Sequence, residues 1–71
     1  MNHDSLNLTV NGKQYQVDGN PSVSEFLATT GFKPTQVVVE HNGRVLERHN
    51  LGEIMLHDGD RLEIIVPVAG G

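Results

Sequence analysis

The sequence contains no cysteine among its 71 residues. Disulfides, zinc sites built from thiolates and cysteine nucleophiles are therefore excluded. Proteins kept in a reducing cytoplasm rarely carry disulfides, so the absence of cysteine is consistent with the cytoplasmic location that we expect for this chain.

An excess of positive charge and a long apolar run are also absent. Five Lys and Arg residues stand against nine Asp and Glu residues, which gives a net charge of −4 at pH 7. Nucleic acid and anionic membrane surfaces are therefore poor partners, and a basic protein surface is a better match. The longest apolar run is far shorter than the ~20 residues of a membrane span. Residues 1–5 lack the basic and apolar regions of a signal peptide.

The length of the chain predicts a single domain with one small core. Apolar residues make up 37% of the sequence, and a core of this size stabilises a fold by no more than about 3–5 kcal/mol. We expect residues 1–5 to be a disordered lead-in, residues 6–67 to form the domain, and residues 68–71 to be a flexible tail.

The first part of the domain reads as a β-hairpin. Residues 6–10 and 13–17 alternate apolar and polar side chains, the period of half-buried strands. The Asn-Gly pair at residues 11–12 tolerates the positive φ angles of a two-residue type I′ turn. Such a turn places the apolar side chains of both strands on one face. The predicted register pairs Val10 with Lys13, Leu8 with Tyr15 and Leu6 with Val17.

A helix is predicted after the hairpin. Residues 22–25 read Ser-x-x-Glu, a capping box in which each side chain bonds a free backbone N–H at a helix start. Gly31 is a typical C-terminal cap, and Pro34 prevents the helix from resuming. One stripe of side chains follows the helical spacing i, i+3, i+4 and i+7: Val23, Phe26, Leu27 and Thr30.

A second hairpin is predicted after the helix. Residues 37–40 are rich in β-branched side chains and read as a strand. The Asn-Gly pair at residues 42–43 is a hairpin signal that leads into residues 45–46. Residues 47–56 show no clear period, and we expect an irregular loop with a short helical turn.

The last strand is expected over residues 62–66, after a tight turn at residues 58–60. Its nearly continuous apolar side chains favour a central place in the sheet. Pro67 cannot donate to a strand ladder, so regular pairing should end near it. The strand is far enough along the chain to pair in parallel with the first strand, with the helical segment as the crossover.

These elements predict an α+β fold with a mixed sheet of four or five strands packed on one helix. Alternation along the strands places Val37 and Val39 toward the helix, and Val38 and Glu40 away from it. The expected core contains Leu6, Leu8, Val10, Tyr15, Val17, Phe26, Leu27, Leu62 and Ile64.

Five stretches of the chain resemble the β-grasp, or ubiquitin-like, fold. Their spacing is most similar to that of the ThiS family, the small sulfur carriers of thiamine biosynthesis. The pattern NGR-V-L-x-R at residues 42–48 and L-x-DGDRLEI at residues 56–64 are typical of that family. The five stretches are VNG at 10–12, PSVSEFL at 21–27, VVVEHNGRVLER at 37–48, LHDGDRLEII at 56–65 and AGG at 69–71.

Related proteins leave alternatives to the thiamine carrier. The small subunit of molybdopterin synthase shares the fold and would also suit the ending PVAGG, but its chain is usually longer. Ala69 departs from the third glycine that often precedes the final pair. A protein modifier conjugated through Gly71, and a ubiquitin-like interaction module that makes no use of its end, are the further possibilities.

The resemblance implies that the carboxylate of Gly71 is the reactive group of a carrier protein that is not itself an enzyme. A ThiF-like adenylyltransferase would activate the carboxylate with ATP, and the chain would bind no cofactor of its own. A sulfur donor, such as a cysteine desulfurase system, would then form the thiocarboxylate for a thiazole synthase. The tail of Val68, Ala69, Gly70 and Gly71 would enter the partner's active site, where glycine is slim enough to pass. We expect the free carrier to be a monomer.

A partner interface is expected beside the tail. Val38 and Ile65 should point outward from neighbouring strands, with Pro67 following on the same side. Members of the family meet their enzymes through this face. The simpler interpretation is that these are isolated apolar residues on the surface, which need no functional explanation.

No metal site is expected from the histidines. His41, His49 and His57 recur every eight residues, but none are at i, i+4 on the predicted helix, and we expect solvated surface side chains. The turn at residues 58–60 begins like a calcium loop but lacks the later ligands. Since no glycine-rich phosphate loop follows a strand, ATP binding is left to the partner.

Overall fold

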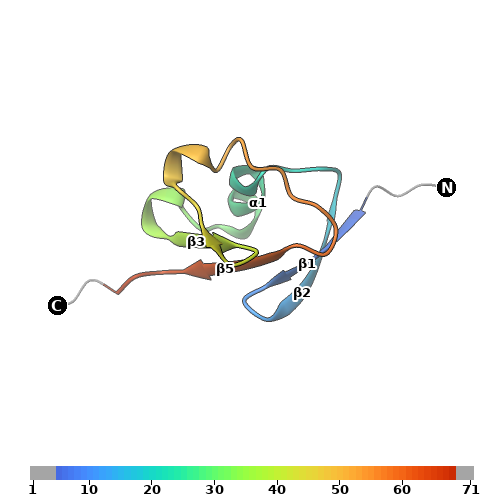
Figure 1. The fold of residues 1–71 in the computed structure, drawn as a ribbon, viewed down its shortest axis with the longest axis horizontal. Helices are drawn as coiled ribbons and strands as arrows, with labels where there is room; N and C mark the ends of the chain where they lie inside the picture. The colour runs from blue at the N-terminus through green and yellow to red at the C-terminus, as the bar shows by residue number, and fades with distance from the viewer. Residues whose placement is uncertain (1–4, 69–71) are drawn as a thin grey trace.

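The computed structural model describes residues 5–68 of the chain (Figure 1). The predicted lead-in over residues 1–5 and tail over residues 68–71 therefore lie largely outside the described residues. The elements, in chain order, are β1 (Ser5–Val10), β2 (Lys13–Asp18), α1 (Val23–Thr30), the 3-10 helix η1 (Pro34–Gln36), β3 (Val38–His41), β4 (Arg44–Val45), the 3-10 helix η2 (Arg48–Asn50) and β5 (Arg61–Ile65).

The described strands form one five-stranded mixed sheet in the order β2-β1-β5-β3-β4. β5 pairs in parallel with β1 and antiparallel with β3, which confirms its predicted central place. Helix α1 covers one face of the sheet, as Figure 1 shows. The predicted α+β fold is therefore confirmed. No helix within residues 5–68 is long and apolar enough to cross a membrane.

Local signals set the first hairpin and the helix start as predicted. All three predicted pairs of the β1–β2 register are present, and Asn11 and Gly12 have φ of 51° and 80°. The Ser22 hydroxyl accepts a hydrogen bond from the Glu25 N–H at 3.1 Å, and the Glu25 carboxylate accepts one from the Ser22 N–H at 2.8 Å. The capping box is thereby confirmed.

The core differs from the prediction at Tyr15. Its side chain is 41% exposed, because β2 is an edge strand and the eight-residue helix α1 covers the centre of the sheet. The Tyr15 ring stands edge-on to the Phe26 ring, with 6.0 Å between the centroids. Leu6 and Val17 are only partly buried. The buried apolar side chains are Leu8, Val10, Val23, Phe26, Leu27, Val37, Val39, Leu51, Leu56, Leu62 and Ile64.

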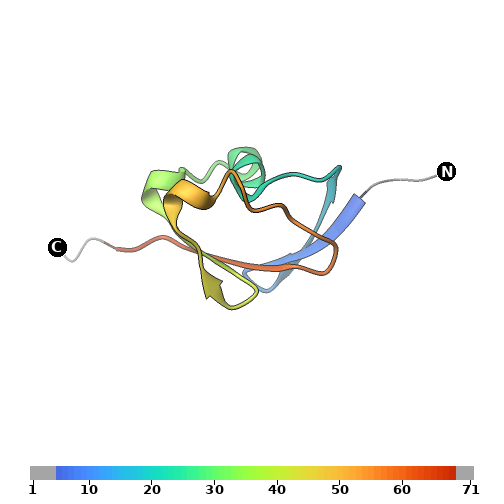
Figure 2. The same ribbon diagram turned by 45° about the horizontal axis from the view of Figure 1, so that its top comes forward.

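The stretch between η2 and β5 contributes two core residues that the prediction missed. Leu51 is 4% exposed and Leu56 is fully buried. Backbone hydrogen bonds tie this stretch to the helix start, including Ser24 N–H to the Leu51 carbonyl and Val23 N–H to the Ile54 carbonyl. Figure 2 shows the stretch running from η2 past α1 to the turn before β5. An irregular segment can enter a core when its backbone groups find partners in this way.

Candidate functional site

The described chain leaves the sheet just after its central strand. β5 ends at Ile65, and the next residues are open to solvent, with Val66 55% and Val68 91% exposed. Pro67 has no N–H to donate, so strand pairing cannot continue through it. Ala69, Gly70 and Gly71 of the predicted tail lie outside the described residues.

The side chain of Asn11 holds β5 close to this exit. Its Oδ1 accepts a hydrogen bond from the Ile64 N–H at 2.7 Å, and its Nδ2 donates to the Ile64 carbonyl at 3.2 Å. β1 has ended at Val10, so the amide takes the place of the next strand residue. The sequence analysis found Asn11 only as a turn residue. Its partner lies 53 residues away, and no local pattern could reveal it.

The predicted interface residues lie together on the sheet face away from α1. Val38 and Ile65 are directly opposite in the β3–β5 register, and their side chains are 36% and 45% exposed. Pro67 is exposed and lies two residues after Ile65, beyond the end of β5. Val45, which the prediction did not include, lies opposite Glu40 and is 65% exposed.

A hollow lies between the exit of the chain and η1. Arg48 lines it together with Val38, Val66 and Pro67. The Arg48 Nε donates to the Pro34 carbonyl at 3.1 Å and its Nη2 to the Thr35 carbonyl at 3.3 Å. Arg48 therefore ties the turn before β3 to η2. In the sequence it was visible only as the last residue of a family pattern.

His41 is not the solvated surface histidine that was predicted. Its Nε2 lies 2.8 Å from the Asp60 Oδ2, and its side chain is 19% exposed. The prediction failed because the turn before β5 brings Asp60 against β3, 19 residues away in sequence. His49 and His57 are exposed as expected. Within residues 5–68, no group of three or more His, Asp or Glu side chains could hold a metal ion.

Asp60 is the centre of a polar network at the far end of β5 from the exit. Besides His41, its carboxylate accepts hydrogen bonds from the Asn42 side chain at 3.1 Å and from the His57 N–H at 2.9 Å. Burial raises the pKa of Asp60, but the hydrogen bonds from His41, Asn42 and His57 outweigh it, so the pKa lies below its ordinary value of 3.8. These hydrogen bonds join the two ends of the turn at residues 57–60 and connect that turn to the end of β3.

Comparison with known proteins bears directly on this site. The sequence model of the ThiS family matches residues 8–71. The crystal structure of a thiamine biosynthesis protein, ThiS, from Geobacter metallireducens is 40% identical and superposes with a TM-score of 0.82, covering 93% of this chain and 100% of that one. A designed protein based on human erythrocytic ubiquitin is 20% identical with a TM-score of 0.54, covers 96% of each chain, and shares the fold. These likenesses confirm the ubiquitin-like fold.

A thiazole synthase from Paramagnetospirillum magneticum is 27% identical over 66 residues. The match covers 93% of this chain. This chain spans only 20% of the length of that synthase.

Proposed function

Because the chain belongs to the ThiS family, we propose that it is a sulfur carrier of thiamine biosynthesis whose Gly71 carboxylate cycles through an acyl-adenylate and a thiocarboxylate. The family match over residues 8–71 carries this proposal, since it includes both the folded domain and the final glycine. The likeness to a thiamine biosynthesis protein over its full length supports the same pathway.

The chemistry requires a partner, because a carboxylate is a poor electrophile. An adenylyltransferase of the ThiF type would join the Gly71 carboxylate to the AMP unit of ATP and release pyrophosphate. The outer sulfur of a persulfide on a donor protein would then attack the carbonyl carbon and displace AMP, and a thiol would reduce the S–S bond of the resulting acyl disulfide to release the thiocarboxylate. The acyl-adenylate hydrolyses readily, so the partner's site must exclude water. The carrier takes part as a co-substrate and contributes position rather than catalytic groups.

The fold suits this role because it holds the base of the tail firmly. β5 is paired on both edges, by β1 and the Asn11 amide on one side and by β3 on the other. Gly71 follows Ile65 by six residue positions, and an extended chain of that length would span about 20 Å. A tail of this reach would allow Gly71 to enter a deep site of the partner while Val38, Ile65 and Pro67 meet the surface around the entrance.

We assign thiazole synthase as the acceptor of the sulfur. The likeness to one-fifth of a thiazole synthase supports this assignment over molybdopterin synthase. A carrier-like segment found within that synthase is a reason to expect the two functions to work together. The cytoplasmic location and the monomeric state of the free carrier remain predictions.

The test is an intact-mass measurement of the chain after incubation with ATP, the adenylyltransferase and a sulfur donor. We expect the mass increase that corresponds to exchange of one oxygen for sulfur, and no increase when ATP is omitted. A chain with one extra residue after Gly71 should not react, because an amide replaces the carboxylate. Gly70→Val should block entry of the tail sterically. Both variants should melt like the unmodified protein.

The control variants separate a carrier from an interaction module. A module that makes no use of its end would bind its partners equally well with an extended or altered tail. Partner-dependent AMP release from the extended chain at the wild-type rate would contradict the carrier proposal.

A further inference from the structure

Two Asn-Gly turns hold the central strand β5 from its two sides. Asn11 and Asn42 have φ of 51° and 52°, and the glycine after each of them also has positive φ. The Asn11 N–H donates to the Leu62 carbonyl at 2.9 Å. The Asn42 N–H donates to the Arg61 carbonyl, also at 2.9 Å. The two turns therefore repeat one arrangement beside the same strand.

An asparagine followed by glycine is open to hydrolysis of its side-chain amide. The backbone nitrogen of the glycine attacks the Cγ of the asparagine and forms an N–Cγ bond. The Cγ–Nδ2 bond breaks, and the amide nitrogen leaves as ammonia with the proton of the glycine N–H. Water then opens the cyclic imide at either carbonyl, which gives an aspartate or an isoaspartate. Glycine favours the attack because it has no Cβ to hinder its nitrogen.

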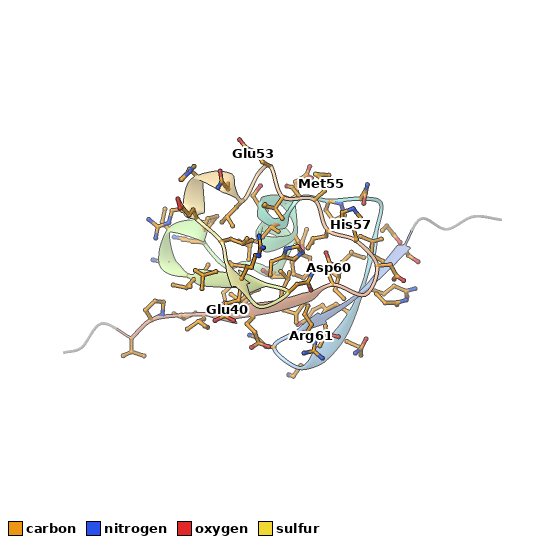
Figure 3. The ribbon with its side chains drawn as sticks, in the orientation of Figure 1. Glu40, Glu53, Met55, His57, Asp60 and Arg61 are labelled. Atoms are coloured by element: carbon orange, nitrogen blue, oxygen red, sulfur yellow. The ribbon has the colours of Figure 1, made fainter. Side chains whose placement is uncertain are left out.

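The fold restrains this reaction because it holds both side-chain amides. Asn11 accepts a hydrogen bond from the Ile64 N–H at 2.7 Å and donates to the Ile64 carbonyl at 3.2 Å. Asn42 accepts one from the Arg61 N–H at 2.9 Å and donates to the Asp60 Oδ1 at 3.1 Å. Figure 3 shows Asp60 and Arg61 together where the chain enters β5. Each amide must leave these partners before its Cγ can turn toward the glycine nitrogen.

The two amides differ in what their release leaves behind. The hydrogen bonds of Asn11 are partly buried, and Ile64 is only 5% exposed. Release of Asn11 would leave two backbone groups of Ile64 without these partners, which is costly away from water. The bond between Asn42 and Arg61 is exposed, so water can replace the amide there. Asp60 keeps two other hydrogen-bond donors when Asn42 leaves.

The hairpin that carries Asn42 is also the shorter one. β3 and β4 share two residue pairs, to which a backbone hydrogen bond from the Leu46 N–H to the Val39 carbonyl is added. β1 and β2 share six residue pairs. Both β2 and β4 are edge strands, and both asparagines are exposed, so neither strand position nor access to water separates the two turns. A segment held by fewer backbone hydrogen bonds opens at a lower cost in free energy.

We propose that Asn42 is a site of spontaneous deamidation in the folded protein, and that its conversion to a carboxylate loosens the start of β5. The new carboxylate oxygen replaces the Nδ2 that donates to Asp60 at 3.1 Å. A hydrogen bond thereby becomes a contact between two negative charges, which disfavours the ionised form of each. An isoaspartate also adds a carbon to the main chain of a two-residue turn, whose geometry sets the hairpin register. Asn11, in the same dipeptide, stays intact for longer.

The test measures hydrolysis of the two amides in one chain. The full chain is kept at mildly alkaline pH, well below its melting temperature, in water labelled with ¹⁸O. Mass spectrometry of its peptides follows the gain of labelled oxygen at each asparagine. Asn42 should react at least about tenfold faster than Asn11. In denaturant the two should react at similar rates, because the dipeptide is the same and the fold no longer holds either amide. Equal rates in the folded protein, or a faster reaction at Asn11, would overturn the inference.

Thermal melts test the effect of the product on the fold. Asn42→Asp carries the aspartate product from the start, and it should melt about 4–8 °C below the wild type. Asn20→Asp is the matched control, because Asn20 is exposed and its side chain makes no hydrogen bond within residues 5–68. The control should melt close to the wild type. If Asn42→Asp melts like the control, the loosening of β5 is disproved. None of these measurements needs a partner enzyme, so their outcome is independent of the carrier function.

Discussion

Replacement of Asn11 by glycine tests whether its side chain anchors β5 near the exit of the chain. Glycine keeps the backbone conformation, since the φ of 51° at this position is one that glycine adopts without strain. The variant loses two hydrogen bonds to Ile64, at 2.7 and 3.2 Å. Each is worth about 0.5–1.5 kcal/mol net, so we expect a loss of about 2 kcal/mol.

This loss is large for so small a domain. A destabilisation of 1 kcal/mol lowers the melting temperature of a 60–100-residue domain by about 4–8 °C, so Asn11→Gly should melt roughly 8–16 °C below the wild type. Asn11→Asp keeps the acceptor but loses the donor, and it places a carboxylate beside the Ile64 carbonyl. It should also be destabilised, with the Ile64 N–H still bonded.

The assays are urea and thermal unfolding followed by circular dichroism, with amide hydrogen exchange measured at Ile64. Asn20→Gly is the matched control, because it carries a similar backbone entropy cost and the Asn20 side chain makes no hydrogen bond within residues 5–68. The Ile64 amide should exchange faster in Asn11→Gly and stay protected in Asn20→Gly. Equal melting temperatures and equal Ile64 protection in the two glycine variants would refute the anchoring role.

Three further predictions concern the core, the polar network and the interface. Phe26→Ala, which removes a 2% exposed ring, should cost about 3–5 kcal/mol and leave much of the protein unfolded at ambient temperature; a wild-type melt would contradict the core assignment. Because the pKa of Asp60 is lowered from 3.8 in the fold, its charge stabilises the protein above that pH, and this stabilisation is lost as the pH falls through the folded pKa. The wild type and Asp60→Asn should therefore differ less in their urea unfolding midpoints well below pH 3.8 than at neutral pH. A difference that does not change with pH would disprove stabilisation by the Asp60 charge. Ile65→Glu should fold normally but bind the adenylating enzyme more weakly in a titration, and unchanged affinity would remove Ile65 from the interface.

Short-range signals in the sequence determined the first hairpin and the helix start. The Asn-Gly turn and the alternating strands agree on one register, and the structure has that register. The Ser22–Glu25 capping box and the αL cap at Gly31, with φ of 88°, bound the helix as predicted. These features depend on residues within a few positions of each other, so a single sequence contains all the information that they require.

The outward direction of the interface residues was also open to prediction. Strand alternation places Val38 and Ile65 away from the helix, and both are exposed on one face. The proposed reactive group, the carboxylate of Gly71, came from the family pattern at the end of the chain and lies outside the described residues.

Only the tertiary structure decided the contacts between distant parts of the chain. Asn11 bonds Ile64 across 53 positions, and His41 meets Asp60 across 19. Leu56 enters the core from a stretch with no regular period, and Tyr15 is left exposed at a sheet edge. The physical reason is that alternation along a strand states which side a residue faces, but the order of the strands and the course of the loops determine what lies on that side.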